Sequence, residues 1–180
     1  MLVVVAVNVG RRNFDSMKTL IIVRHGKSSW AYPDLEDFYR PLKPRGINDA
    51  FNIGDELLKR DVFPDLILSS PAIRAMNTAI IIARKLDFPL QRIRANESIY
   101  EASTYHLLNL ISNVEDNNET LMIFGHNPSF TSLINQLQEE SLYNLPTCGV
   151  FAIELPIDSW SDIAKAKGKK VLELFPKEVA

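Results

Sequence analysis

The sequence has a single cysteine, Cys148, so no disulfide can form within the chain. It has no hydrophobic run near the ~20 residues that a helix needs to cross a bilayer. An excess of positive charge is also missing, since the formal net charge is −2, and this argues against a protein that binds nucleic acid. We therefore expect a protein of a reducing compartment such as the cytoplasm, with neither membrane nor nucleic-acid partners. Cys148 precedes an apolar run and is predicted to be a small buried residue.

The chain is long enough for one domain with a substantial core. It has 180 residues, of which 46% are apolar and 23% charged, as is typical of a globular protein. The apolar start, residues 1–6, is short and has no preceding basic residue, so it does not resemble a secretory signal. The recognisable pattern begins at Met17. We expect residues 1–16 to be an N-terminal extension without a catalytic role, followed by one domain over residues 17–177.

Strand-like and helix-like segments alternate along this domain. Short apolar runs predict strands at 19–24, 65–69, within 93–100, 120–124, 149–155 and 170–175. Helical periodicity predicts helices at 44–60, 71–86, 104–114 and 128–138. In the first helix the expected buried face is Ile47, Ala50, Phe51, Gly54, Leu57 and Leu58. In the second, Ser70 is the expected N-cap, Pro71 the first residue, and the buried stripe is Ile73, Met76, Ala79, Ile80 and Ala83. The alternation predicts an α/β fold, a three-layer α/β/α sandwich with a mostly parallel central sheet.

Three polar motifs follow predicted strands. Arg24-His25-Gly26 ends the first strand, Ser69-Ser70-Pro71 with Arg74 opens the second helix, and Gly125-His126-Asn127-Pro128 opens the fourth. Ligand sites of open α/β sheets lie outside the carboxyl ends of the strands. We expect the three motifs to meet at that edge.

The residues of these motifs suit phosphoryl transfer. Arg24 and Arg74 can each bind two phosphate oxygens through the planar guanidinium, and His126 can add a donor or a charge. His25 is the candidate nucleophile, since an imidazole with a pKa near ~6.5 is available in its neutral form and the arginines disfavour a further cation. The expected reaction forms a phosphohistidine on His25 and needs no metal or cofactor. Ser28 and Asn127 are further candidates for contact with the substrate.

These motifs make the chain similar to the histidine phosphatase superfamily, also called phosphoglycerate-mutase-like, and within it to the small SixA-type phosphohistidine phosphatases. The resemblance covers about residues 17–177. It rests on Arg24-His25-Gly26, Asp37 with Arg40-Pro41-Leu42 and Gly46, Ser69-Ser70-Pro71 with Arg74, and Gly125-His126-Asn127-Pro128. It implies that His25 is the phosphorylated residue and that Arg24, Arg74 and His126 complete a phosphate pocket.

The sequence departs from the pattern of this superfamily in two ways that bear on the substrate. Many phosphomonoesterases of this superfamily have an acidic residue that protonates the leaving group. Glu101 is the candidate here, with Glu97 a weaker one, although a surface carboxylate leading a helix explains Glu101 equally well. The segment between Glu101 and His126 is only long enough for one helix and one strand, so we expect no lid over the pocket. An open pocket admits a histidine on a protein surface.

We therefore expect a metal-independent phosphatase, a monomer, that acts on phosphohistidine in a phosphorelay or phosphotransfer domain. One alternative is a phosphatase for a small phosphomonoester. Another is a phosphate-recognition module without catalysis, which would not need the nucleophile. Mutase activity would require a lid. His106, the remaining histidine, is expected on the surface of its helix.

Overall fold

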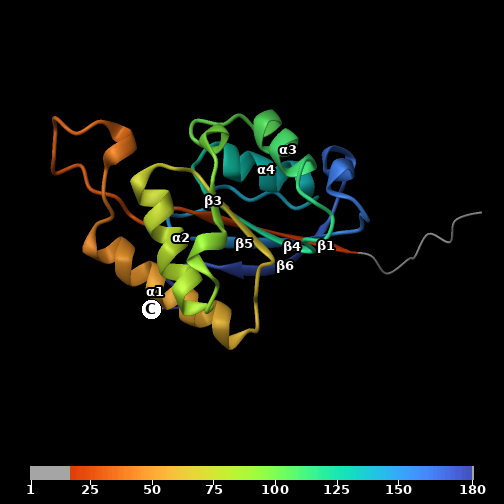
Figure 1. Cartoon of the computed structure of the whole chain (residues 1–180), viewed down its shortest axis with the longest axis horizontal. Coiled ribbons are helices and arrows are strands. Elements are labelled where there is room, and N and C mark those ends of the chain that lie inside the picture. The colour runs from red at the N-terminus through yellow and green to blue at the C-terminus, as the bar shows by residue number, and fades with distance from the viewer. Residues whose placement is uncertain (1–16, 180) are drawn as a thin grey trace, which may run out of the picture.

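A six-stranded sheet forms the centre of the protein (Figure 1). The computed structural model describes residues 17–179. The order across the sheet is β3-β2-β4-β1-β5-β6. The strands are β1 (Lys18–Arg24), β2 (Leu66–Ser69), β3 (Ile93–Ala95), β4 (Thr120–Gly125), β5 (Val150–Leu155) and β6 (Lys169–Leu174).

The first four strands in sequence are parallel, and the last two are antiparallel to their neighbours. β1 pairs with β4 in the register Arg24↔Gly125, and β2 pairs with β4 in the register Ser69↔Phe124. The carboxyl ends of β1, β2 and β4 therefore lie side by side at one edge. This confirms the prediction of a mostly parallel sheet and places the starts of three motifs together.

Helices cover both faces of the sheet (Figure 1). The helices are α1 (Pro44–Lys59), α2 (Ile73–Lys85), α3 (Thr104–Ser112) and α4 (Ser129–Leu137), with short 3₁₀ helices η1 (Asp37–Tyr39), η2 (Leu90–Arg92), η3 (Glu97–Ile99) and η4 (Trp160–Lys165). Successive residues of a strand point to opposite faces. Leu20 and Ile22 accordingly join the core beneath α3 and α4, and Ile21 and Val23 the core beneath α1 and α2. The structure is thus the predicted α/β/α sandwich.

Two helix predictions are wrong in detail. In α1 the buried residues are Gly46, Ala50, Ile53, Gly54 and Leu57, whereas Ile47, Phe51 and Leu58 are exposed. Ala50, Gly54 and Leu57 are therefore confirmed as buried residues. The other three predicted residues are wrong, because the face is shifted to include Gly46 and Ile53 in their place.

The start of α2 differs as well. The helix begins at Ile73 with Ala72 as its N-cap, so Ser70 and Pro71 precede it. The predicted Ala79 and Ala83 are buried, which confirms that part of the stripe, whereas the predicted Ile73, Met76 and Ile80 are only half-buried. The remaining buried residues of the helix are Arg74, Ala75, Thr78 and Ile82. The face is displaced because the helix turns Arg74 toward the end of the sheet.

Other expectations agree with the structure. Cys148 is fully buried and burial raises the pKa of its thiol, so it is a core residue, and His106 is exposed. Between Glu101 and His126 the chain forms α3 and β4 with their connections, as expected. No helix within residues 17–179 has the length and apolar character of a membrane span. The predicted extension, residues 1–16, lies outside the described residues.

Candidate active site

A polar cavity of about 230 Å³ lies at the edge where β1 and β4 end. Four of its lining residues were predicted to form the site: Arg24, His25, Arg74 and His126. The predicted substrate-binding residues Ser28 and Asn127 also line it, together with Lys27, Trp30, Arg40 and Thr147. The lining thus has four cationic side chains: Arg24, Lys27, Arg40 and Arg74. So many cations around one small cavity favour a compact anion such as a phosphoryl group. Within residues 17–179, no three His, Cys, Asp or Glu side chains cluster as metal ligands would.

His25 is held in the orientation that a nucleophile requires. It follows the last residue of β1, and its backbone N–H donates to Gly125 O of β4 at 3.0 Å. The ring Nδ1 is 2.7 Å from Gly26 O, which can only accept, so Nδ1 carries the proton. The lone pair then resides on Nε2, which accepts from Arg74 Nε at 3.3 Å.

Arg74 joins the two histidines. Its Nη2 lies 3.4 Å from His126 Nδ1, and since a guanidinium only donates, that nitrogen is the acceptor. His126 Nε2 then donates to Ser70 Oγ at 2.9 Å. The two imidazole rings lie 5.1 Å apart, centroid to centroid. Arg74 thus reaches the atom expected to attack phosphorus and the ring expected to stabilise the transferred group.

Both histidines are neutral at physiological pH. Burial lowers the pKa of His25 to about 4, and the charges of Arg74 and Arg24 act in the same direction, against the hydrogen bond to Gly26. Burial lowers the pKa of His126 to about 3, with further contributions from His25 and Arg74. A neutral His25 keeps the lone pair that nucleophilic attack needs.

Arg24 retains an unused donor. Its Nη1 donates to Leu145 O at 2.8 Å, but Arg24 Nε is buried and has no hydrogen-bond partner among residues 17–179. A buried donor without a partner is costly and is rare in proteins. Arg24 also lines the cavity, where its guanidinium can donate to a bound anion.

Asp37 organises the site, although the sequence analysis gave it no role. Its Oδ2 accepts from Arg74 Nη2 at 2.7 Å and from Tyr100 Oη at 3.1 Å, and its Oδ1 accepts from Arg40 Nη1 at 2.6 Å. Its backbone carbonyl accepts a further bond from Arg74 at 2.5 Å. Burial tends to raise the pKa of Asp37, but Arg40 and Arg74 outweigh it and keep the pKa below its ordinary value. This carboxylate therefore fixes two cations.

Arg40 and Tyr100 are the other residues that sequence reasoning missed. Arg40 Nη2 donates to Ser28 Oγ at 2.6 Å, which ties a predicted contact residue to the same network. Tyr100 packs edge-on against His126 with the ring centroids 5.6 Å apart. Asp37 and Arg40 were visible in the sequence as part of the family resemblance, but nothing in their spacing indicated that they contact Arg74 or Ser28.

Glu101 is placed differently from the other candidates. It is exposed, follows η3 with a positive φ of 54°, and does not line the cavity. Glu97, in η3, is also exposed. Asn127 lies in the wall of the cavity, where its Nδ2 donates to Leu145 O at 3.1 Å and to Asn144 Oδ1 at 2.9 Å. The structure therefore brings together every predicted site residue except Glu101.

Comparison with known proteins agrees with this geometry. The sequence profile of the histidine phosphatase superfamily (branch 1) matches residues 20–104. An uncharacterized chloroplastic protein of Arabidopsis thaliana is 30% identical over 159 residues, which cover 84% of this chain and 72% of the relative. The chain belongs to the histidine phosphatase superfamily.

Solved structures agree with this assignment, and one of them narrows it within the superfamily. A structure assigned to the phosphohistidine phosphatase SixA from Agrobacterium tumefaciens is 27% identical, with a TM-score of 0.76 over 88% of this chain and 98% of the other. The protein histidine phosphatase SixA complexed with tungstate has a TM-score of 0.74 at 18% identity, over 90% of this chain and 99% of the other. The latter shares the fold, and the chain is SixA-like within its superfamily.

Proposed function

We propose that this protein is a metal-independent phosphatase that hydrolyses phosphohistidine on a protein through a covalent phosphohistidine at His25. The observation that carries the proposal is the state of His25: a neutral ring whose Nδ1 is committed to Gly26 O and whose Nε2 faces Arg74. The SixA-like neighbours support the same class of substrate.

In the first step, His25 Nε2 attacks the phosphorus atom and the bond from phosphorus to the substrate nitrogen breaks. The lone pair of Nε2 enters the new P–N bond, and the electron pair of the old bond stays on the leaving imidazole. Arg74 Nε, which donates to Nε2 in the free protein, is placed to donate to a phosphoryl oxygen instead. Arg24 adds a second guanidinium to the charge that develops on the oxygens, and His126 adds a donor once its Nε2–H exchanges Ser70 Oγ for a phosphoryl oxygen.

In the second step, water attacks the phosphorus of phospho-His25 and the P–Nε2 bond breaks. The proton on Nδ1 remains there throughout, donated to Gly26 O, so the ring leaves as a neutral imidazole and is restored to its starting form. The proton lost by water goes to the released inorganic phosphate. Neither step requires a proton transfer at His25.

A phosphorylated imidazole also suits the acid-poor cavity. When the nitrogen distal to phosphorus carries a proton, the substrate imidazole leaves as a neutral base and needs no general acid. An alkoxide leaving group would need a proton, and the cavity lining contains neither aspartate nor glutamate. Glu101 lies outside the cavity lining, so its proposed role as a general acid toward alkyl phosphates requires its side chain to turn into the cavity.

The direct test compares substrates under matched conditions: a histidine phosphotransfer domain phosphorylated with phosphoramidate, free phosphohistidine, phosphoglycerate and sugar phosphates. We expect the highest kcat/KM for the phosphorylated domain. A higher kcat/KM with a sugar phosphate or phosphoglycerate would contradict the proposed substrate and favour a small-molecule phosphatase.

The mechanism is tested by replacing the proposed nucleophile and, as a control, a histidine outside the cavity. His25→Ala should abolish hydrolysis of the phosphorylated domain and the acid-labile, alkali-stable labelling expected of a phosphoenzyme. His106→Ala, which replaces an exposed histidine outside the cavity, is the matched control and should retain both. Hydrolysis that persists in His25→Ala would exclude His25 as the nucleophile.

A further inference from the structure

The segment between β1 and α1 carries exposed aromatic side chains beside the cavity. We call residues 30–39 the aromatic loop; it projects beyond the end of the sheet (Figure 1). Its large apolar side chains are exposed to between 38% and 72%: Trp30, Tyr32, Leu35 and Tyr39. Residues 31–35 also line a shallow hollow of their own. Apolar side chains gathered on a surface in this way are characteristic of protein-binding sites.

The aromatic loop is held in place by the residues of the site. Asp37, near its end, accepts hydrogen bonds from Arg74 and Arg40. At its start, the guanidinium carbon of Arg40 lies 3.2 Å from the centroid of the Trp30 ring. Both ends of the segment that carries the exposed side chains are therefore anchored to the site, and within it Leu35 N–H donates to Tyr32 O at 3.2 Å. A surface ordered before binding loses less entropy when a partner docks.

The loop surface is continuous with the cavity. Trp30 lines the cavity and is at the same time the first exposed aromatic residue of the loop. A protein domain is far larger than a cavity of about 230 Å³, so a domain that presents its phosphoryl group to His25 stays mostly outside and extends over the neighbouring loop. Tyr32 and Leu35 do not line the cavity in which a metabolite would bind.

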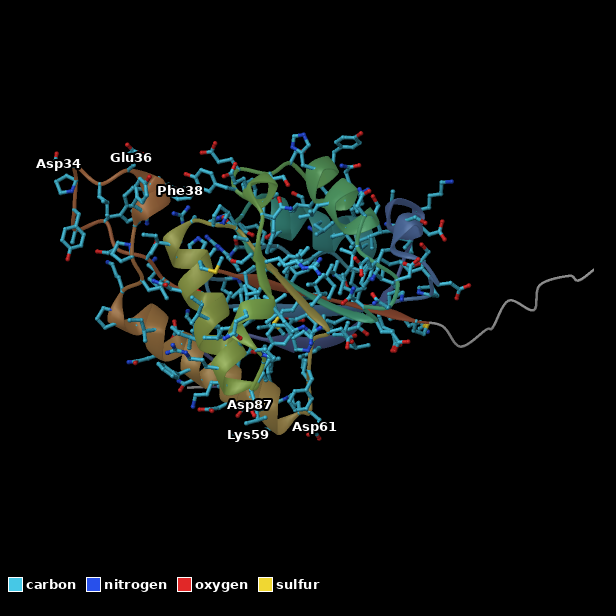
Figure 2. All side chains as sticks on the ribbon, in the orientation of Figure 1. Asp34, Glu36, Phe38, Lys59, Asp61 and Asp87 are labelled. Carbon is cyan, nitrogen blue, oxygen red and sulfur yellow. The ribbon has the colours of Figure 1, made fainter. Side chains whose placement is uncertain are left out.

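The charges on the loop indicate the chemistry of the partner. Asp34 and Glu36 are exposed near its tip, and Figure 2 shows both at the outer edge of the molecule. The cavity itself is cationic through Arg24, Arg40 and Arg74. The complementary surface thus has an anionic phosphoryl group, apolar side chains beside it and basic side chains farther out.

We propose that the aromatic loop is the docking surface for the phosphohistidine-bearing domain, through Tyr32 and Leu35 against apolar side chains and through Asp34 and Glu36 against basic ones. This inference rests on the proposed function. It adds that the enzyme distinguishes a histidine on a folded domain from the same phosphoramidate bond in a small molecule by contacts outside the cavity.

The test compares two substrates that have the same bond: the phosphorylated histidine phosphotransfer domain and free phosphohistidine. The Tyr32→Ala/Leu35→Ser variant should lower kcat/KM for the domain roughly tenfold or more and leave free phosphohistidine unchanged. The control is Phe63→Ala, an exposed aromatic residue in the segment before β2, at the amino edge of the parallel strands. Figure 2 labels Asp61 of that segment, far from Asp34 and Glu36. Phe63→Ala should change neither rate.

The outcomes separate this inference from the proposed function. If the wild type hydrolyses both substrates and the loop variant loses nothing with the domain, the docking surface is wrong and the phosphatase proposal stands. If the loop variant lowers kcat/KM equally for both substrates, the docking surface is also wrong, because the loop then affects the cavity and not the contact with the domain. A wild type that hydrolyses free phosphohistidine at least as well as the domain would exclude docking. Hydrolysis of neither would reject the proposed function, and the docking surface with it.

Discussion

Arg74 Nε donates to His25 Nε2 over 3.3 Å, so the guanidinium of the second motif touches the nucleophilic atom of the first. The contact spans 49 positions of sequence. It depends on β1, which ends before His25, and on β2, which leads to α2; the two strands lie on either side of β4 in the sheet. In the free protein this hydrogen bond occupies the lone pair of His25 Nε2. A phosphoryl group that bonds to Nε2 must displace Arg74 Nε, which then has the oxygens of that group as its nearest acceptors. Arg74 is therefore already at the position where negative charge develops.

Asp37 determines where Arg74 points. We expect Asp37→Asn to lower kcat/KM with p-nitrophenyl phosphate by roughly tenfold or more, because a shift of about 1 Å in a positioning group can cost ~10²-fold in rate. Stability should change less than the rate, since the Asp37 side chain is 43% exposed, although that of Arg74 is only 7% exposed, and asparagine keeps one acceptor oxygen for the guanidinium. Asp34→Asn, on the same loop, is the control and should leave kcat/KM unchanged. If Asp37→Asn loses activity only because a smaller fraction of the protein is folded, as unfolding in urea would show, the positioning role is contradicted.

Most of the fold could be predicted from the sequence because buried parallel strands are short apolar runs. Thr19 to Arg24 and Thr120 to Phe124 were located almost to the residue for that reason. The buried face of α1 was predicted only in part. Gly54 was predicted to be buried, but Gly46 was not: it is buried because the backbone of Lys27 approaches closely, and periodicity of bulky residues does not report such a contact.

The site was predictable in part. Arg24, His25 and His126 directly follow or end strands, so the parallel sheet brings them to one edge. Asp37 and Tyr100 reach Arg74 and His126 from connections without regular hydrophobic pattern. Their contacts depend on how those connections fold back over the sheet, which local sequence does not specify. The start of α2 was misplaced because Ser70 is not its N-cap. Ser70 Oγ accepts instead from His126 Nε2 and from Ala72 N–H, which precedes the helix.

Glu101 can be tested by its selectivity among leaving groups. As the proposed general acid, it should matter for an alkyl phosphate and not for phosphohistidine. We expect Glu101→Gln to slow hydrolysis of an alkyl phosphate roughly 10²-fold, the lower range for loss of general acid catalysis, and to leave phosphohistidine hydrolysis unchanged. Glu97→Gln is the control in the adjacent η3. Equal rates of the Glu101→Gln variant and the wild type with the alkyl phosphate would remove Glu101 from the mechanism.

Gly46 lies where α1 meets the segment after His25. A Cβ atom at this position would lie 2.7 Å from Lys27 N and still closer to Lys27 O. In an exposed helix, replacement of glycine by alanine gains about 1 kcal/mol. Here the clash is with backbone, and overpacking of this kind costs about 1–3 kcal/mol. We therefore expect Gly46→Ala to lower the free energy of unfolding in urea, and also kcat/KM, because Lys27 lines the cavity. Asn48→Ala, at an exposed position of the same helix, should not be destabilising; a stabilised Gly46→Ala would show that the approach is not tight.

The two buried histidines make stability depend on pH in a defined window. The pKa is about 4 for His25 and about 3 for His126 in the folded protein, below the ~6.5 of an imidazole in the unfolded chain. The unfolded state therefore binds more protons, and stability is fully present above pH ~6.5 and is lost as the pH falls toward the folded-state pKa values. Each histidine contributes a slope of up to about 1.4 kcal/mol per pH unit.

We expect the free energy of unfolding, measured in urea and phosphate-free buffer, to decrease from pH 7 to pH 5. Carboxylates contribute little in that window, since their unfolded pKa values lie near ~4. The His25→Gln/His126→Gln variant should have a nearly flat profile over the same range; a wild-type profile equally flat would mean that the rings are not held neutral.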